Sequence, residues 1–168
     1  MTRSSRIGLT VAALLFVIAA PAVAKNMFNA HLSGKSAVPA RETHANGQAM
    51  FTLSSDGTTL QYKIILNNIE NVVSVRLENA ATGATGPEIA VLYGPAAPGG
   101  GKVSGPFATG TLSATNLVGP MAGRTIADLV AEIQAGRVYV NVLTDDGVGA
   151  PNEKPGDFSS GEIRGQLD

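Results

Sequence analysis

The chain has 168 residues, of which 12 are basic and 13 acidic, with a formal net charge of −1 and no cysteine. The lack of cysteine excludes a disulfide-stabilised scaffold and any cysteine-ligated metal site. The even charge balance, without clusters of lysine and arginine, argues against a nucleic-acid partner. The length suffices for one domain with its own core.

The first 24 residues have the pattern of a secretory signal peptide. Arg3 and Arg6 form a basic start, an uncharged apolar run follows, and the segment ends with Ala22 and Ala24 at the positions where signal peptidase requires small residues. We expect cleavage after Ala24 and a single mature domain, residues 25–168, in the periplasm or outside the cell.

The alternative to a signal peptide is an uncleaved membrane anchor. The apolar run is shorter than the roughly 20 residues of a membrane-spanning helix, and it ends at a cleavage pattern. We therefore expect no stable membrane insertion after cleavage. Removal of two arginines gives the mature domain 10 basic and 13 acidic residues, a formal charge of −3.

Most of the mature chain consists of short runs in which apolar and polar residues alternate, separated by Gly, Pro, Asn and Asp. This pattern is typical of an all-β sandwich or barrel. Asp56-Gly57 indicates a tight hairpin turn and Asn67-Asn68 a second turn, whereas the Gly/Pro-rich segment 94–101 indicates a mobile surface loop. The predicted strands are 27–32, 48–53, 60–66, 71–78, 88–93, 107–112, 138–143 and 161–167.

One segment has the features of an α-helix. Thr125 and Asp128 have the spacing of a capping box, and Gly136 stands where a C-terminal cap belongs. Apolar residues recur between them at helical spacing, so we expect the helix to lie across an open end or edge of the sheets. The next strand, 138–143, is expected to be central.

Two strands carry charged pairs on faces that we expect to be outward. Arg76 and Glu78 alternate with apolar residues in one strand, and Glu162 and Arg164 do so in the last. These four residues are our candidate partner-binding residues, because a guanidinium can pair with a carboxylate or phosphate on a partner. The alternatives are a solvated ion pair at Arg76 and Glu78, and a cross-strand pair that fixes register at a sheet edge at Glu162 and Arg164.

Several of these segments together resemble the CHRD domain family, named after chordin. The similar pieces follow the family's order over nearly the whole mature chain. They are Leu32-Ser33-Gly34 with Val38-Pro39, Gly47 to Phe51, Asp56 to Tyr62, Asn68 to Val72, Gly83 to Pro87, Ala135 to Val142, and Gly161-Glu162-Ile163-Arg164-Gly165-Gln166-Leu167.

The residue patterns predict a β-sandwich of about eight strands with one accessory helix, and the resemblance implies that it is an exported, antiparallel, Greek-key-like sandwich of the immunoglobulin or superoxide-dismutase type. Typical members carry His-Ile-His in the strand that holds Arg76 and Glu78, and a further histidine at the position of Leu143. Three histidines in this arrangement would suit copper or zinc. Arginine and leucine supply no metal ligand, so we predict no cofactor and no metal at this place.

The remaining candidate metal ligands are few. His31 and His44 are the only histidines, and Asp145, Asp146 and Asp157 lie in the loop before the last strand. The aspartates offer the oxygen ligands that calcium prefers, but their spacing does not match an EF-hand. Neither a nucleophilic catalytic motif nor a phosphate-binding loop is present.

We therefore predict a non-enzymatic exported module that binds or scaffolds an unknown protein or surface polymer. The alternative is a metal-binding (copper, zinc or calcium) or redox-related protein with a degenerate histidine site. A self-associating matrix or surface component is a third possibility.

Overall fold

The structure is a computed structural model that describes residues 25–168, so the predicted signal peptide lies outside the described residues. It is all-β with one α-helix, as predicted. No helix of the described residues is both long and apolar enough to cross a membrane. The strands are β1 (Met27–Ser33), β2 (Asn46–Leu53), β3 (Leu60–Glu70), β4 (Val72–Asn79), β5 (Glu88–Tyr93), β6 (Lys102–Leu112), β7 (Val138–Thr144) and β8 (Ile163–Gln166).

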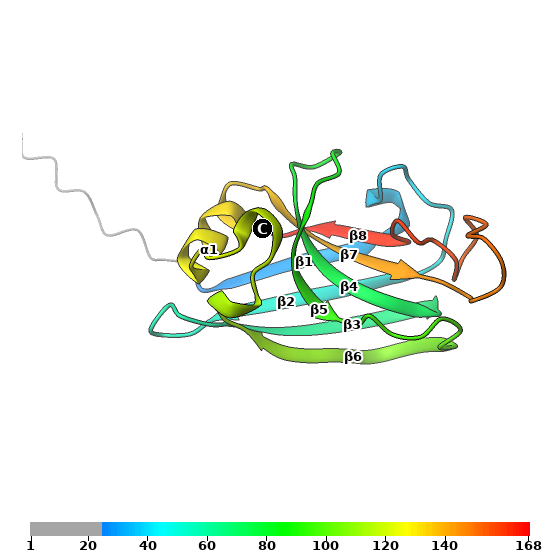
Figure 1. Cartoon of the computed structure of the whole chain (residues 1–168), viewed down its shortest axis with the longest axis horizontal. Coiled ribbons are helices and arrows are strands. Elements are labelled where there is room, and N and C mark those ends of the chain that lie inside the picture. The colour runs from blue at the N-terminus through cyan, green and yellow to red at the C-terminus, as the bar shows by residue number, and fades with distance from the viewer. Residues whose placement is uncertain (1–24) are drawn as a thin grey trace, which may run out of the picture.

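The eight strands form one antiparallel sheet in the order β5-β4-β7-β8-β1-β2-β3-β6. The sheet curls so that its two halves enclose a single core, which gives a nearly closed, sandwich-like shape (Figure 1). Side chains join the two edge regions: the Tyr62 hydroxyl donates to the Leu92 carbonyl at 2.7 Å, and the rings of Tyr93 and Phe107 meet edge to face at 4.6 Å. β7 lies inside the sheet, as predicted.

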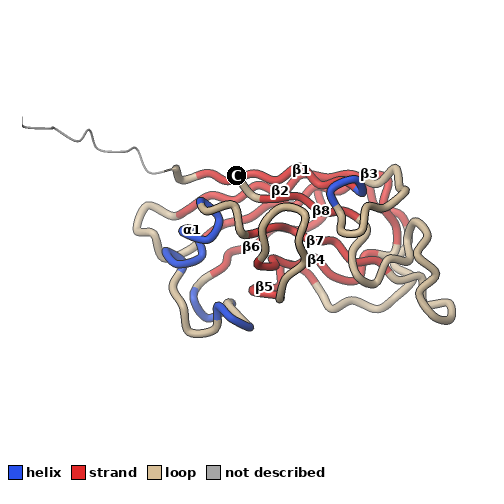
Figure 2. Tube along the Cα trace, turned by 90° about the horizontal axis from the view of Figure 1, so that it is seen from above, coloured by secondary structure: helices blue, strands red, loops and turns tan. Residues whose placement is uncertain are grey.

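The helix α1 (Ile126–Gln134) begins at the predicted capping box, in which the Thr125 hydroxyl accepts from the Asp128 amide. The helix lies at one end of the molecule (Figures 1 and 2), and its apolar stripe is buried. Three single-turn 3-10 helices, which the sequence did not indicate, lie in the loops: η1 (Gly34–Ser36), η2 (Ala114–Asn116) and η3 (Gly119–Met121).

Two local predictions were wrong. Asn67-Asn68 is not a turn. β3 continues to Glu70, and a bulge between Leu66 and Ile69 shifts its register with β6. Asn68 adopts a φ of 52°, a left-handed conformation that asparagine tolerates better than most residues, so the chain bulges there instead of reversing. β6 also begins at Lys102, five residues earlier than expected.

The last strand also differs from the prediction. β8 is not an edge strand, because it lies between β7 and β1. Glu162 and Arg164 were expected to face outward into solvent, but they are 0% and 3% exposed. Loops from distant parts of the chain cover them, which the alternation within the strand could not reveal.

Candidate functional site

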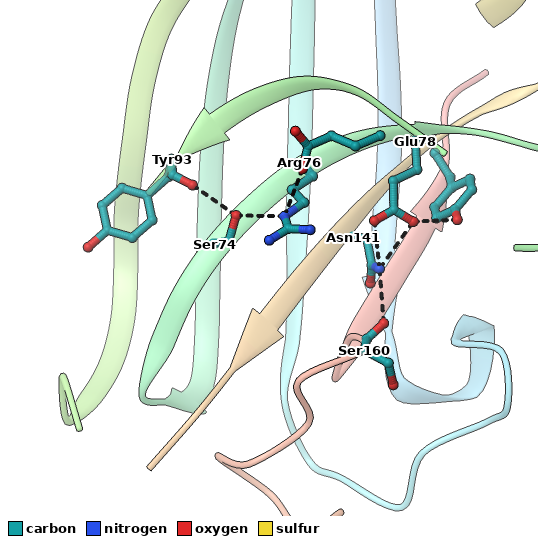
Figure 3. A network of polar contacts seen from close by, with 8 residues as sticks. Ser74, Arg76, Glu78, Tyr93, Asn141 and Ser160 are labelled. Atoms are coloured by element: carbon teal, nitrogen blue, oxygen red, sulfur yellow. Dashed lines mark hydrogen bonds and ion pairs between the residues drawn. The ribbon is translucent and has the colours of Figure 1, made fainter. Parts of the chain in front are cut away.

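A group of polar side chains lies on the outer face of β4, β7 and β8. The strand register places Arg76 opposite Asn141, which in turn lies opposite Arg164, and it places Glu78 opposite Tyr139 in the next row. Alternation along each strand sends these five side chains to the side away from the core. We call these five residues the polar face; Figure 3 shows Arg76, Glu78 and Asn141 together.

Arg76 is held by one side of its guanidinium only. Its Nε lies 3.1 Å from a carboxylate oxygen of Glu88 and 3.0 Å from the Ser74 hydroxyl, which donates to the Tyr93 carbonyl (Figure 3). The two terminal nitrogens make no hydrogen bond within residues 25–168, and the side chain is 34% exposed. Arg76 is therefore partly exposed on this face, and its ion-pair partner is Glu88 and not Glu78.

Glu78 turns toward β7 instead. The Tyr139 hydroxyl donates a short hydrogen bond to its carboxylate, and the Asn141 amide donates to both carboxylate oxygens at 3.3 Å. The Tyr139 hydroxyl also accepts from the Gly86 amide at 3.1 Å. Burial, together with the hydrogen bond to Glu78, raises the pKa of Tyr139 to about 12, so this hydroxyl stays a donor over the ordinary pH range.

Arg164 lies over the ring of Tyr139, with its guanidinium carbon 3.4 Å from the ring centre. It donates to the carbonyls of Ala84 at 2.7 Å and Ala81 at 3.3 Å, and so holds the turn of residues 80–87 over the polar face. Burial lowers the pKa of Arg164 from its ordinary value, opposed by the nearby Tyr139 and Glu78. No ion pair among residues 25–168 includes this arginine.

Glu162 does not pair with Arg164 and does not reach the surface. Its carboxylate accepts hydrogen bonds from the hydroxyls of Thr43 at 2.6 Å and Thr144 at 2.9 Å, and from the Gly156 amide at 2.9 Å. These donors come from three separate segments. Glu162 therefore ties loops together, and its predicted outward position is wrong.

The three positions that the resemblance associates with histidines do lie near one another. Arg76 and Glu78 are two residues apart on one face of β4, and Leu143 lies opposite Ser74, one step along the same face. Leu143 is buried, however, and only Glu78 lines one of the hollows of this surface. The arrangement offers a single carboxylate, already hydrogen-bonded, and no imidazole, so these three positions do not provide the ligand set of three histidines.

The structure separates the metal-ligand candidates. The carboxylates of Asp145, Asp146 and Asp157 lie within 4.8 Å of one another, and within residues 25–168 this is the only group of at least three such ligands. His31 and His44 are exposed and belong to no such group. Oxygen donors without imidazole suit calcium and not copper.

Sequence reasoning missed Tyr139 and Asn141. Asn141 interrupts an otherwise apolar strand, and a lone amide at such a position is a signal that could have found the cluster. No comparable sequence signal shows that the turn of residues 80–87 covers the polar face. The turn is held by hydrogen bonds from Arg164, which lies about 80 positions later in the chain.

Comparison with known proteins identifies the family. The family model described as the CHRD domain matches residues 28–150, most of the chain and nearly all of the part before β8. No curated protein and no solved structure gives a match.

Proposed function

The chain belongs to the CHRD domain family, and from this premise we propose that it is an exported, non-enzymatic module that binds or scaffolds a partner in the periplasm or extracellular space through its polar face. A CHRD domain suggests a non-enzymatic module. The partner is a protein or a surface polymer.

One observation carries this proposal: the polar face keeps unused hydrogen-bonding capacity on a rigid support. The terminal nitrogens of Arg76 make no hydrogen bond within residues 25–168, while three neighbouring strands fix its position. Guanidinium donors held in place favour planar anionic groups on a partner. Glu78, which lines a hollow of this face, would orient that partner, whereas Arg164 and Glu162 are enclosed and hold the surrounding loops in place.

Site-directed photo-crosslinking in the producing cells tests the proposal. Thr85 is exposed and lines a hollow beside Glu78 and Tyr139, whereas Thr109 is exposed on the distant edge strand β6. A photo-reactive residue at position 85 should give a discrete adduct that the same residue at position 109 does not give. Equal labelling at both positions would contradict the proposal.

Export is tested separately by the intact mass of the protein recovered outside the cytoplasm. We expect the mass of a chain that begins at Lys25. A recovered mass that includes residues 1–24 would support the uncleaved anchor instead.

Metal binding remains the second candidate function, and the three clustered aspartates favour calcium. Asp157 is 2% exposed and takes part in none of the ion pairs among residues 25–168. Calorimetric titration of the exported protein with calcium, copper and zinc tests this alternative. Stoichiometric calcium binding that disappears in Asp157→Asn would favour it.

A further inference from the structure

A hollow of about 430 Å³ lies beyond the polar face, where the sheet continues from β8 into β1 and β2. Three side chains that can each ligate a metal ion line it: the imidazole of His31, the thioether of Met50 and the carboxylate of Asp168. Neither lysine nor arginine is among the lining residues, so no fixed positive charge opposes a cation there. We call these three residues the ligand cluster.

The strand register places the ligand cluster on one face of the sheet. Asn29 of β1 lies opposite Met50 on one side, and on the other side it exchanges two backbone hydrogen bonds with Asp168, at 3.1 and 3.2 Å. His31 follows Asn29 on the same face of β1, because alternate residues of a strand project to the same side. His31 is therefore a diagonal neighbour of both Met50 and Asp168. Diagonal neighbours are about 7–8 Å apart, which is within the reach of long side chains.

No member of the ligand cluster is engaged elsewhere in the described part of the chain. Within residues 25–168, none of the three side chains makes a hydrogen bond or an ion pair. His31 and Asp168 are exposed and Met50 is half-buried, whereas the flanking Ala49 and Phe51 belong to the core. An ion can therefore be bound by changes of surface rotamers alone, without loss of core contacts.

The chemistry of these ligands favours copper in its reduced state. A thioether is a soft ligand that selects Cu(I), and an imidazole also suits copper. Calcium and magnesium prefer ligand sets made of oxygen, which this cluster does not provide. We infer that His31 and Met50 bind Cu(I) at the outer face of β1 and β2, and that the Asp168 carboxylate completes the site and offsets the charge of the ion. This inference goes beyond partner binding, and the site shares no residue with the polar face or with the three clustered aspartates.

Anaerobic titration of the exported protein with Cu(I), followed by nuclear magnetic resonance, tests the inference. We expect a single equivalent of Cu(I) to shift the ring signals of His31 and the methyl signal of Met50. His44 and Met27 are internal controls, because both are exposed but do not line the hollow. Shifts of equal size at the two controls, or no shift at His31 or at Met50, would overturn the inference.

Paired substitutions measure what each ligand contributes. His31→Gln and Met50→Leu should each weaken Cu(I) binding at least about tenfold, in competition with a chromogenic Cu(I) chelator. His44→Gln and Met27→Leu should each weaken it by less than about twofold. The thermal midpoint of each variant, measured in parallel, should stay close to that of the parent, because none of the four side chains is fully buried. Equal losses in the test and control variants would show adventitious binding to exposed side chains and overturn the assignment.

Discussion

Glu162 has the lowest exposure of any charged residue among those described, and its role is to connect loops. Its carboxylate accepts three hydrogen bonds, from Thr43, Thr144 and Gly156, and offers no proton in return. Glu162→Gln turns one carboxylate oxygen into an NH₂ group, so at least one of these three donors loses its acceptor. We expect a loss of about 2 kcal/mol or more in the free energy of unfolding, measured by denaturant titration.

Glu42 provides the matched control for this change, because it is exposed and immediately precedes Thr43. Glu42→Gln should change the free energy of unfolding by less than about 0.5 kcal/mol. If both substitutions have the same small effect, the hydrogen bonds to Glu162 do not hold the loops.

Tyr139 gives the polar face a measurable pH dependence. Its folded-state pKa of about 12 lies above the ordinary tyrosine value of 10.0, so the folded state retains the proton more strongly than the unfolded chain. The resulting stabilisation is complete below pH 10 and is lost as the pH rises toward 12. Chemical denaturation at pH 9 and pH 11 should therefore show a lower free energy of unfolding at the higher pH.

Tyr139→Phe tests whether this hydroxyl is responsible. The substitution leaves the Gly86 amide without its acceptor and Glu78 with only the Asn141 amide as donor, which should cost about 1–3 kcal/mol at pH 7. The decline between pH 9 and pH 11 should also become shallower. An unchanged decline would assign it to the other tyrosines.

At the scale of secondary structure, α1 depends on its N-terminal cap. The Thr125 hydroxyl accepts from the Asp128 amide, and the Asp128 carboxylate accepts from the Thr125 amide. Thr125→Ala removes the first of these bonds and should lower the free energy of unfolding by about 1 kcal/mol. Thr82→Ala, in an exposed loop, is the control and should be nearly neutral; a loss of equal size there would argue against capping.

Elements fixed by local signals were predictable from the sequence, and elements fixed by distant contacts were not. The cap at Thr125 and the turn at Gly57, whose φ is 72°, need only neighbouring residues. Glu162 and Arg164 were predicted to face solvent because alternation within a strand shows which side chains point away from the core. It does not show whether loops from elsewhere in the chain cover them. The residues that cover them lie about 80 to 120 positions away in the sequence. The same limit explains why Arg76 and Glu78 were found while the cluster around them was not.

For the whole molecule, the central feature is that side chains, not a strand ladder, join the two edge regions of the sheet. A Cβ atom at Gly110 of β6 would overlap the ring of Tyr62, whose hydroxyl reaches Leu92 of β5. Gly110→Ala should therefore displace Tyr62 and lower the thermal midpoint by several degrees, about 4–8 °C per kcal/mol lost in a small domain. Gly100→Ala, where a Cβ atom meets nothing within 4 Å, should leave the midpoint unchanged or slightly raised.

The account of function depends on one claim, that the face formed by β4, β7 and β8 is where this CHRD domain meets its partner. The most direct test is the photo-crosslinking yield from position 85 compared with position 109 in the producing cells. Our account predicts a discrete adduct at position 85 that is reduced when Arg76→Ala is added, because the free guanidinium nitrogens then disappear. An adduct of equal yield at both positions would contradict it, and so would an adduct at position 85 whose yield is unchanged by Arg76→Ala.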